Sequence, residues 1–334
     1  MDKSVFLLCK QNVVITRLHI CTWNINHKKY FTEYGIEINR NNLTHLDIAL
    51  ALPQQCQKKD FVCLYENIIT PNNSRFIFNS DITKTSPING DTRFGVNISL
   101  GKDRDITVLP LEGSVAFDMQ MQKITIEIPS QAHKIIYLRF LVKSEAPSFS
   151  FIKRGISKIN IIYDVRVNDC RTASKDVINA QKNGYHLINI EKCFCFHIIP
   201  NSFSLDFIQG NKLKTIRGLE DIEFNEYLGD SIRETEKIKL KEQEYNIVFC
   251  KQENKTSYSF FSVYSKDFIG TPQIILALAV NIICSLLFAA GGLHTQVYNM
   301  DLTYIERIPW EYWTALGVLI VLLIVSIIYI TRKK

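Results

Sequence analysis

A short segment of this chain holds three side chains that can bind a metal ion. Cys193, Cys195 and His197 stand at every second position of an apolar run that is typical of a β-strand. All three should therefore project from one face, with Phe194 and Phe196 on the other. Zinc accepts such ligands, but it usually takes them from loops with CxxC-type spacing, and no such pair stands elsewhere. We interpret the three residues as an ordinary half-buried strand face, and we expect no metal and no cofactor.

Other reactive side chains do not fall into a catalytic pattern. The sequence contains no GxSxG or HExxH motif, and no GxxxxGK[ST] or GxGxxG phosphate loop. Histidines of the predicted strands and loops stand singly on separate segments: His19, His27, His45, His133 and His186. We therefore expect that the chain is not an enzyme. The alternative is a membrane-bound enzyme whose site forms between two β domains.

Two long apolar runs lie near the C-terminus and contain no Asp, Glu, Lys or Arg. Ile274 to Leu293 counts 20 residues and Trp313 to Ile330 counts 18, and a helix needs about 20 residues to cross a bilayer. Because only 19 residues separate the runs, they should form a helical hairpin over residues 272–330. The lipid bilayer is then one partner of the chain.

The charges around the two runs predict an orientation. Lys266 precedes the first run and the tail 331–334 holds Arg332, Lys333 and Lys334, whereas acidic residues dominate the loop between the runs. Positive flanks mark the cytoplasmic side, so both termini should be cytoplasmic and the protein should lie in the cell inner membrane. Aromatic residues that would anchor the second run at the interface are Trp310, Tyr312 and Trp313.

One face of the first run is small or polar. Its members recur every three or four residues: Ala277, Asn281, Ser285, Ala289 and Gly292. Small residues let helix backbones approach, and an amide in lipid seeks a partner, so this stripe should be a packing surface. It either packs within one hairpin that serves only as an anchor, or gathers several subunits around a narrow polar path.

The remainder of the chain should be a β-rich head. In Lys123 to Ile128, apolar and polar residues alternate, and more than ten short segments behave similarly. Helices are expected only over 61–69, 174–182 and 219–234, with a strand over 75–78. We predict two antiparallel β-sandwich-like domains, 1–147 and 148–266, because Glu145 to Ser148 interrupts the pattern. The alternative is one large sandwich whose strands mix across Pro147.

Composition limits the partners of the head. Lys and Arg number 39 against 33 Asp and Glu, with no basic run, so no specific nucleic-acid binding is expected. Nine cysteines form no evident framework, which is typical of a reducing compartment.

The layout of a cytosolic head followed by a two-span hairpin resembles bacterial membrane effectors of antiphage defence, in which sensing on the cytoplasmic side leads to membrane depolarisation. The resemblance rests on this order of parts and on no shared motif. It implies a recognition head that acts as sensor and membrane effector, as a homo-oligomer with a soluble protein partner. The alternative is a scaffold that recruits a soluble partner to the membrane.

Overall fold

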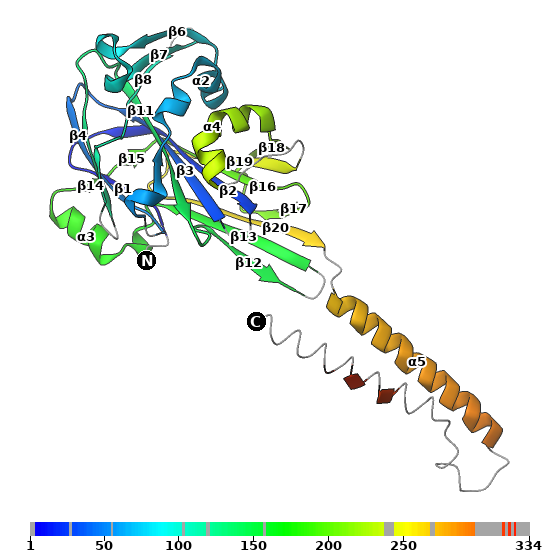
Figure 1. Cartoon of the computed structure of the whole chain (residues 1–334). Coiled ribbons are helices and arrows are strands. Elements are labelled where there is room, and N and C mark those ends of the chain that lie inside the picture. The colour runs from blue at the N-terminus through cyan, green and yellow to red at the C-terminus, as the bar shows by residue number, and fades with distance from the viewer. Residues whose placement is uncertain are drawn as a thin grey trace. The chain divides into compact units, whose positions relative to one another are not determined.

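The computed structural model describes residues 4–26, 29–54, 56–101, 104–117, 121–155, 158–236, 244–267 and 271–297, together with 316–317, 320–321 and 324. The chain folds into two compact units, Met1–Ile152 with Ile161–Ser265 and Lys153–Asn160 with Lys266–Lys334. The described chain is mainly β, with several sheets and few helices (Figure 1). This confirms the coarse fold prediction.

The described strands form three sheets. The five-stranded sheet has the order β14 (His186–Leu187), β1 (Phe6–Cys9), β4 (His45–Ala51), β10 (Gln122–Glu127) and β9 (Val115–Phe117). The 11-stranded sheet has the order β18 (Leu213–Gly218), β19 (Tyr245–Glu253), β16 (Lys192–Pro200), β2 (Val14–Asn26), β3 (Lys29–Asn39), β11 (Ile135–Ser144), β8 (Arg104–Val108), β7 (Val96–Leu100) and β6 (Ile82–Pro87), with β15 (Asn189–Ile190) on β2 and β5 (Phe61–Cys63) on β11. The four-stranded sheet has the order β12 (Ser150–Arg154), β13 (Lys158–Val167), β20 (Tyr258–Asp267) and β17 (Ser204–Ile208).

The 11-stranded sheet is mixed, so the prediction of purely antiparallel sheets is wrong for it. β2 and β16 run parallel, with Leu18 opposite Cys193, and β8 and β11 are also parallel. Strands from both sides of residue 147 share this sheet, because β2, β3 and β11 precede it and β16, β18 and β19 follow. The predicted division into 1–147 and 148–266 therefore does not coincide with the compact units. Alternation along a strand reveals its buried face and not its partner.

Alternate side chains of the 11-stranded sheet enter two separate cores. On one face, Leu18 and Ile20 of β2 join a large core with residues of the five-stranded and four-stranded sheets, such as Ile124 and Phe260. On the opposite face, Trp23 of β2 joins a second core with residues of the helices. The strands of this sheet are thus covered on both faces.

The helices that precede β19 cover outer faces of the sheets (Figure 1). α3 (Lys175–Lys182) confirms the second expected helix. It begins after Ser174, whose Oγ accepts the Val177 N–H, and it packs on the five-stranded sheet. α4 (Asp221–Glu236) confirms the third expected helix. The first expected helix, 61–69, is only partly correct. Residues 61–63 pair with β11, and the chain then forms the short helix α1 (Tyr65–Ile68) and a second helix, α2 (Pro71–Phe78). Pro at the first position of α2 starts the helix where the sequence pattern suggested a break and a strand.

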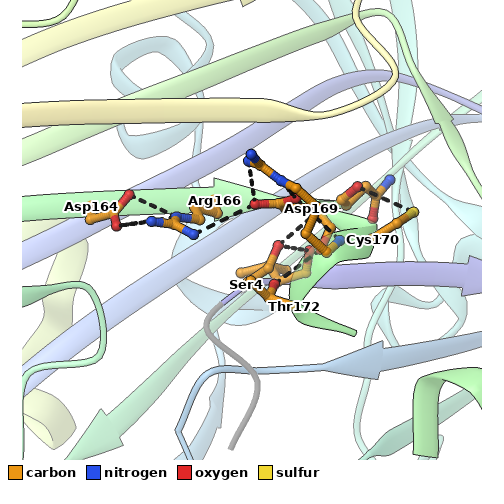
Figure 2. A network of polar contacts seen from close by, with 9 residues as sticks. Ser4, Asp164, Arg166, Asp169, Cys170 and Thr172 are labelled. Atoms are coloured by element: carbon orange, nitrogen blue, oxygen red, sulfur yellow. Dashed lines mark hydrogen bonds and ion pairs between the residues drawn. The ribbon is translucent and has the colours of Figure 1, made fainter. Parts of the chain in front are cut away.

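A polar network ties the first described residues to the end of β13 (Figure 2). The backbone of Val5 donates to the Arg166 carbonyl at 2.9 Å, and Asn168 N–H donates to the Val5 carbonyl at 2.8 Å. The backbone N–H of Asp169 donates to Ser4 Oγ at 3.2 Å, and the Asp169 carboxylate lies 3.6 Å from Arg166 Nη1. This network joins the five-stranded sheet to the four-stranded sheet.

The second unit contains α5 (Thr271–Val297). Its exposed large apolar side chains are Ile274, Leu276, Leu278, Val280 and Ile283. Among the residues that the structure describes, no helix combines the length and the apolar character that crossing a membrane requires. Most of the predicted second span, 313–330, lies outside the described residues. The structure therefore shows the β-rich head and does not show the predicted membrane hairpin.

Candidate functional site

A cavity of about 710 Å³ lies on the helix-covered face of the 11-stranded sheet. We call it the arginine pocket. The residues that line it are Arg17, His19 and Cys21 of β2, Arg104 of β8, Arg139 of β11, Phe194 and Phe196 of β16, Thr215 and Arg217 of β18, Ile247 and Phe249 of β19, Phe76, Ile77 and Phe78 of α2 with Asn79 and Ser80 after it, and Phe224 of α4. Segments far apart in the sequence thus meet at one concave site.

The two-residue period of the strands places these side chains. In β2, Arg17, His19 and Cys21 face the pocket, while the intervening Leu18 and Ile20 are buried in the large core. The same alternation places the pocket residues of the other strands on one face, such as Phe194 and Phe196 of β16. A register irregularity between Ile15 and Arg17 opposite β3 marks the start of the polar face.

Among the residues that the structure describes, the four arginines of the pocket pair with three carboxylates. Arg17 Nε lies 3.7 Å from Glu37 Oε1, and Arg104 forms an ion pair with the same carboxylate. Arg139 pairs with Glu33, and Arg217 pairs with Glu220 at 2.5 Å. Arg17 and Arg104 share the carboxylate of Glu37. These ion pairs therefore contain four guanidinium groups and three carboxylates.

The protonation of His19 depends on its burial and on the nearby arginines. Burial lowers the pKa of His19 well below its usual value, and the charges of Arg139, Arg17 and Arg104 lower it further. The imidazole is therefore neutral at physiological pH. It also lies against the aromatic side of the pocket, with its ring centroid 5.0 Å from that of Phe194.

A buried polar cluster anchors one side of the pocket. Glu33 is 1% exposed and accepts hydrogen bonds from Trp23 Nε1 at 2.8 Å and from Tyr227 Oη at 3.0 Å. It also accepts from Arg139 Nε at 3.0 Å and Nη2 at 2.5 Å. Arg139 Nη1 donates to Tyr137 Oη at 2.9 Å. Since Tyr227 belongs to α4, the cluster attaches this helix to the sheet.

Phenylalanine rings form the apolar part of the pocket. On the sheet side, the Phe196 and Phe249 centroids lie 4.8 Å apart with their planes 9° from parallel. On the helix side, Phe76 meets Phe224 edge to face, with centroids 4.6 Å apart. Aromatic faces and guanidinium groups therefore line the same cavity, an arrangement that suits a ligand with both a planar ring and a negative charge.

One buried thiol lines the pocket among its described residues. Cys21 is its thiol, and burial raises the pKa of that thiol well above the usual value, with Glu33 adding to the effect. The protonated thiol is a poor nucleophile.

The candidate metal ligands of the sequence lie elsewhere, inside the large core. Cys193, Cys195 and His197 share one face of β16 and are each 0% exposed. Burial raises the pKa of Cys195 well above its usual value and lowers the pKa of His197 to about 3. His197 Nδ1 lies 2.9 Å from Thr22 Oγ1, and its ring lies 4.2 Å from that of Tyr163. Within the described residues, no group of three or more His, Cys, Asp or Glu could hold a metal ion.

The residues predicted for membrane packing are only partly described. Ala277, Asn281 and Ser285 are exposed on α5, and Ala289 is half-buried. Ser285 Oγ donates to the Asn281 carbonyl at 2.8 Å, one turn earlier in the helix. Gly292 lies in the backbone of α5, and its surroundings are outside the described residues, as are the predicted anchors Trp310, Tyr312 and Trp313.

Sequence reasoning missed the arginine pocket. The arginines of the pocket, such as Arg17 beside Leu18, form no motif along the chain. One signal in the sequence could have revealed the site. Arg17 shares its strand face with Cys21 and Trp23, and both of these residue types favour burial. The convergence of β2, β8, β11 and β18 on one cavity depends on strand order, which periodicity does not reveal.

Comparisons with known proteins give no functional assignment. No known protein family and no curated protein matches the chain. Among solved structures, a candidate protease from Parabacteroides distasonis ATCC 8503 is similar to 83% of this chain, at 9% sequence identity and a TM-score of 0.29. The match covers 46% of that protein, so this chain spans about half its length. A similarity at this level supports neither a shared fold nor a shared activity.

Proposed function

We propose that the chain is a membrane-anchored receptor whose β head binds a small phosphorylated ring compound of the nucleotide class in the arginine pocket. The observation that carries this proposal is the joint lining of one cavity of about 710 Å³ by four arginines and six phenylalanines. Ligand pockets of drug-sized molecules measure roughly 300 to 1,000 Å³. The volume therefore suits a nucleotide-sized molecule.

The arginines of the pocket suit the phosphate of such a ligand, and the phenylalanines suit its ring. The planar guanidinium fork matches phosphate oxygens, and Arg17 and Arg104 remain partly exposed, at 33% and 25% of their side chains. An incoming phosphate would compete with Glu37 for these two groups. A ring would stack on the faces of Phe194, Phe196 or Phe249 beside the neutral His19.

Equilibrium binding to the full chain in detergent tests this assignment. Adenosine monophosphate should bind more tightly than either adenosine or inorganic phosphate, because only the nucleotide uses both halves. Arg104→Gln should weaken nucleotide binding by roughly 10-fold or more, as expected when a charge-assisted hydrogen bond is lost. Arg93→Gln is the matched control, since Arg93 is 84% exposed and pairs with Asp91 outside the pocket. Equal affinities for all three probes, or equal effects of the two variants, would refute the assignment.

The membrane part of the proposal rests on residues 272–330. The charge-free runs 274–293 and 313–330 support a two-span hairpin in the inner membrane, with head and tail 331–334 in the cytoplasm. The exposed apolar side chains at 274, 276, 278 and 280 of α5 also favour an apolar environment. A reporter fused after Lys334 should be active only in the cytoplasm, and activity only outside would overturn this orientation.

The effector step is assigned to the same hairpin. In this proposal, ligand binding to the head changes the packing of an oligomer through the exposed stripe of Ala277, Asn281 and Ser285, and the membrane is depolarised. A dye that reports membrane potential should show depolarisation in cells that express the wild type and much less with Asn281→Leu. If both proteins leave the potential unchanged in the presence of ligand, the hairpin is an anchor only.

A further inference from the structure

The tip of one β-hairpin carries several positive charges. Where β12 ends and β13 begins, Gly155 N–H donates to the Lys158 carbonyl at 2.8 Å. Lys153, Arg154 and Lys158 at this tip are all exposed. Residues 153–160 contain no acidic side chain. The tip thus presents three exposed cations and no carboxylate.

This tip belongs to the same compact unit as the start of α5. The unit consists of Lys153–Asn160 and Lys266–Lys334. Within it, β20 ends at Asp267 and α5 begins at Thr271, so Lys266 stands only a few residues before the first apolar run. β13 and β20 are neighbours in the four-stranded sheet (Figure 1). The described residues of this unit include four Lys or Arg side chains and one carboxylate side chain, that of Asp267.

We infer that the β12–β13 tip binds the headgroups of anionic phospholipids on the cytoplasmic surface of the membrane. This inference rests on the proposed membrane anchor and is independent of the arginine pocket. Each Lys or Arg close to an anionic membrane surface favours the bound state by roughly 5-fold, from the ~1 kcal/mol expected per cation. The attractions of the three exposed cations therefore add up and favour contact of the tip with an anionic surface. A phospholipid with a neutral headgroup offers no such attraction.

Limited trypsin digestion of the full chain in vesicles tests the inference. The chain is reconstituted into phosphatidylcholine vesicles, with or without about one third phosphatidylglycerol, and cleavage is followed for the heads that face outward. Cleavage after Lys153 and Arg154 should be slower by on the order of 10-fold in the anionic vesicles, and high salt should remove the protection. Cleavage after Lys58 and Lys59, which are exposed on the head, is the internal control and should be equal in both vesicles.

A charge variant makes the test sharper. Lys153→Gln leaves the Arg154 site available and should reduce its protection by roughly 5-fold. Lys84→Gln, at an exposed position of β6, should leave the protection unchanged. Equal cleavage at the tip in both vesicles, from a chain that resists carbonate extraction, overturns the inference and leaves the anchor intact. Release of the chain by carbonate overturns the anchor, and the inference falls with it.

Discussion

Replacement of Arg139 by methionine should destabilise the head more than any exposed charge change at the pocket. The side chain of Arg139 is only 8% exposed and supplies two of the four hydrogen bonds described above for Glu33. Each charge-assisted hydrogen bond contributes about 1.5 to 3 kcal/mol, so losing both costs ~3 to 6 kcal/mol. Breaking one partner of a buried ion pair typically costs about 3 to 5 kcal/mol, which agrees.

The cost should come from the carboxylate that remains buried. The double variant Glu33→Gln with Arg139→Met removes both charges and should cost about 1 to 2 kcal/mol, because only hydrogen bonds and packing are then lost. Arg217→Met is the control. Its side chain is 56% exposed beside Glu220, and exposed pairs contribute about 1 kcal/mol at most.

Urea unfolding of the full chain in detergent, followed by far-UV circular dichroism, measures these differences from the shift in midpoint at constant slope. The order Arg139→Met, then the double variant, then Arg217→Met is expected, with the largest loss first. An Arg139→Met protein as stable as Arg217→Met would refute the assignment of Glu33 and Arg139 as a buried pair.

Two further changes probe the head. Gly35→Ala should cost about 1 to 3 kcal/mol by overpacking, because a Cβ there overlaps the Tyr137 hydroxyl; thermal unfolding checks this, and an unchanged midpoint would place Tyr137 elsewhere. Buried neutral histidines should make the head acid-sensitive. The pKa of His197 is about 3 in the folded state, which is below its unfolded value. The free energy of unfolding should therefore fall as the pH decreases from about 6.5 toward about 3, by ~1.4 kcal/mol per pH unit for this group. In His197→Phe, urea midpoints should depend less steeply on pH in that window, and an unchanged slope would show that His197 does not carry the effect.

The sequence predicted individual strands better than their assembly. β10 shows why: Ile124 and Ile126 are buried and Lys123 and Thr125 exposed, as the alternation requires. Helix α3 was predictable because a serine cap and an Asn-Gly end lie within its own segment. The parallel pairing of β2 with β16 joins residues about 175 positions apart, and no local pattern encodes it.

The candidate site was unpredictable for the same reason. Arg17, Arg104 and Arg139 stand on three strands whose adjacency depends on the strand order of the 11-stranded sheet. Cys193, Cys195 and His197, in contrast, were correctly expected on one strand face, because a two-residue spacing determines the face locally. Chemistry within one strand could be derived from the sequence, and chemistry between strands required the fold.

Photoaffinity labelling tests the central claim, that the arginine pocket binds a phosphorylated ring compound, most directly. The full chain in detergent is irradiated with an azido-adenine nucleotide, and the labelled peptides are identified by mass spectrometry. The account predicts labelling of the peptide that holds Phe194 and Phe196, competition by unlabelled nucleotide, and a loss of label of roughly 10-fold in Arg104→Gln. Labelling confined to other surfaces, or equal labelling of the wild type and Arg104→Gln, would contradict it.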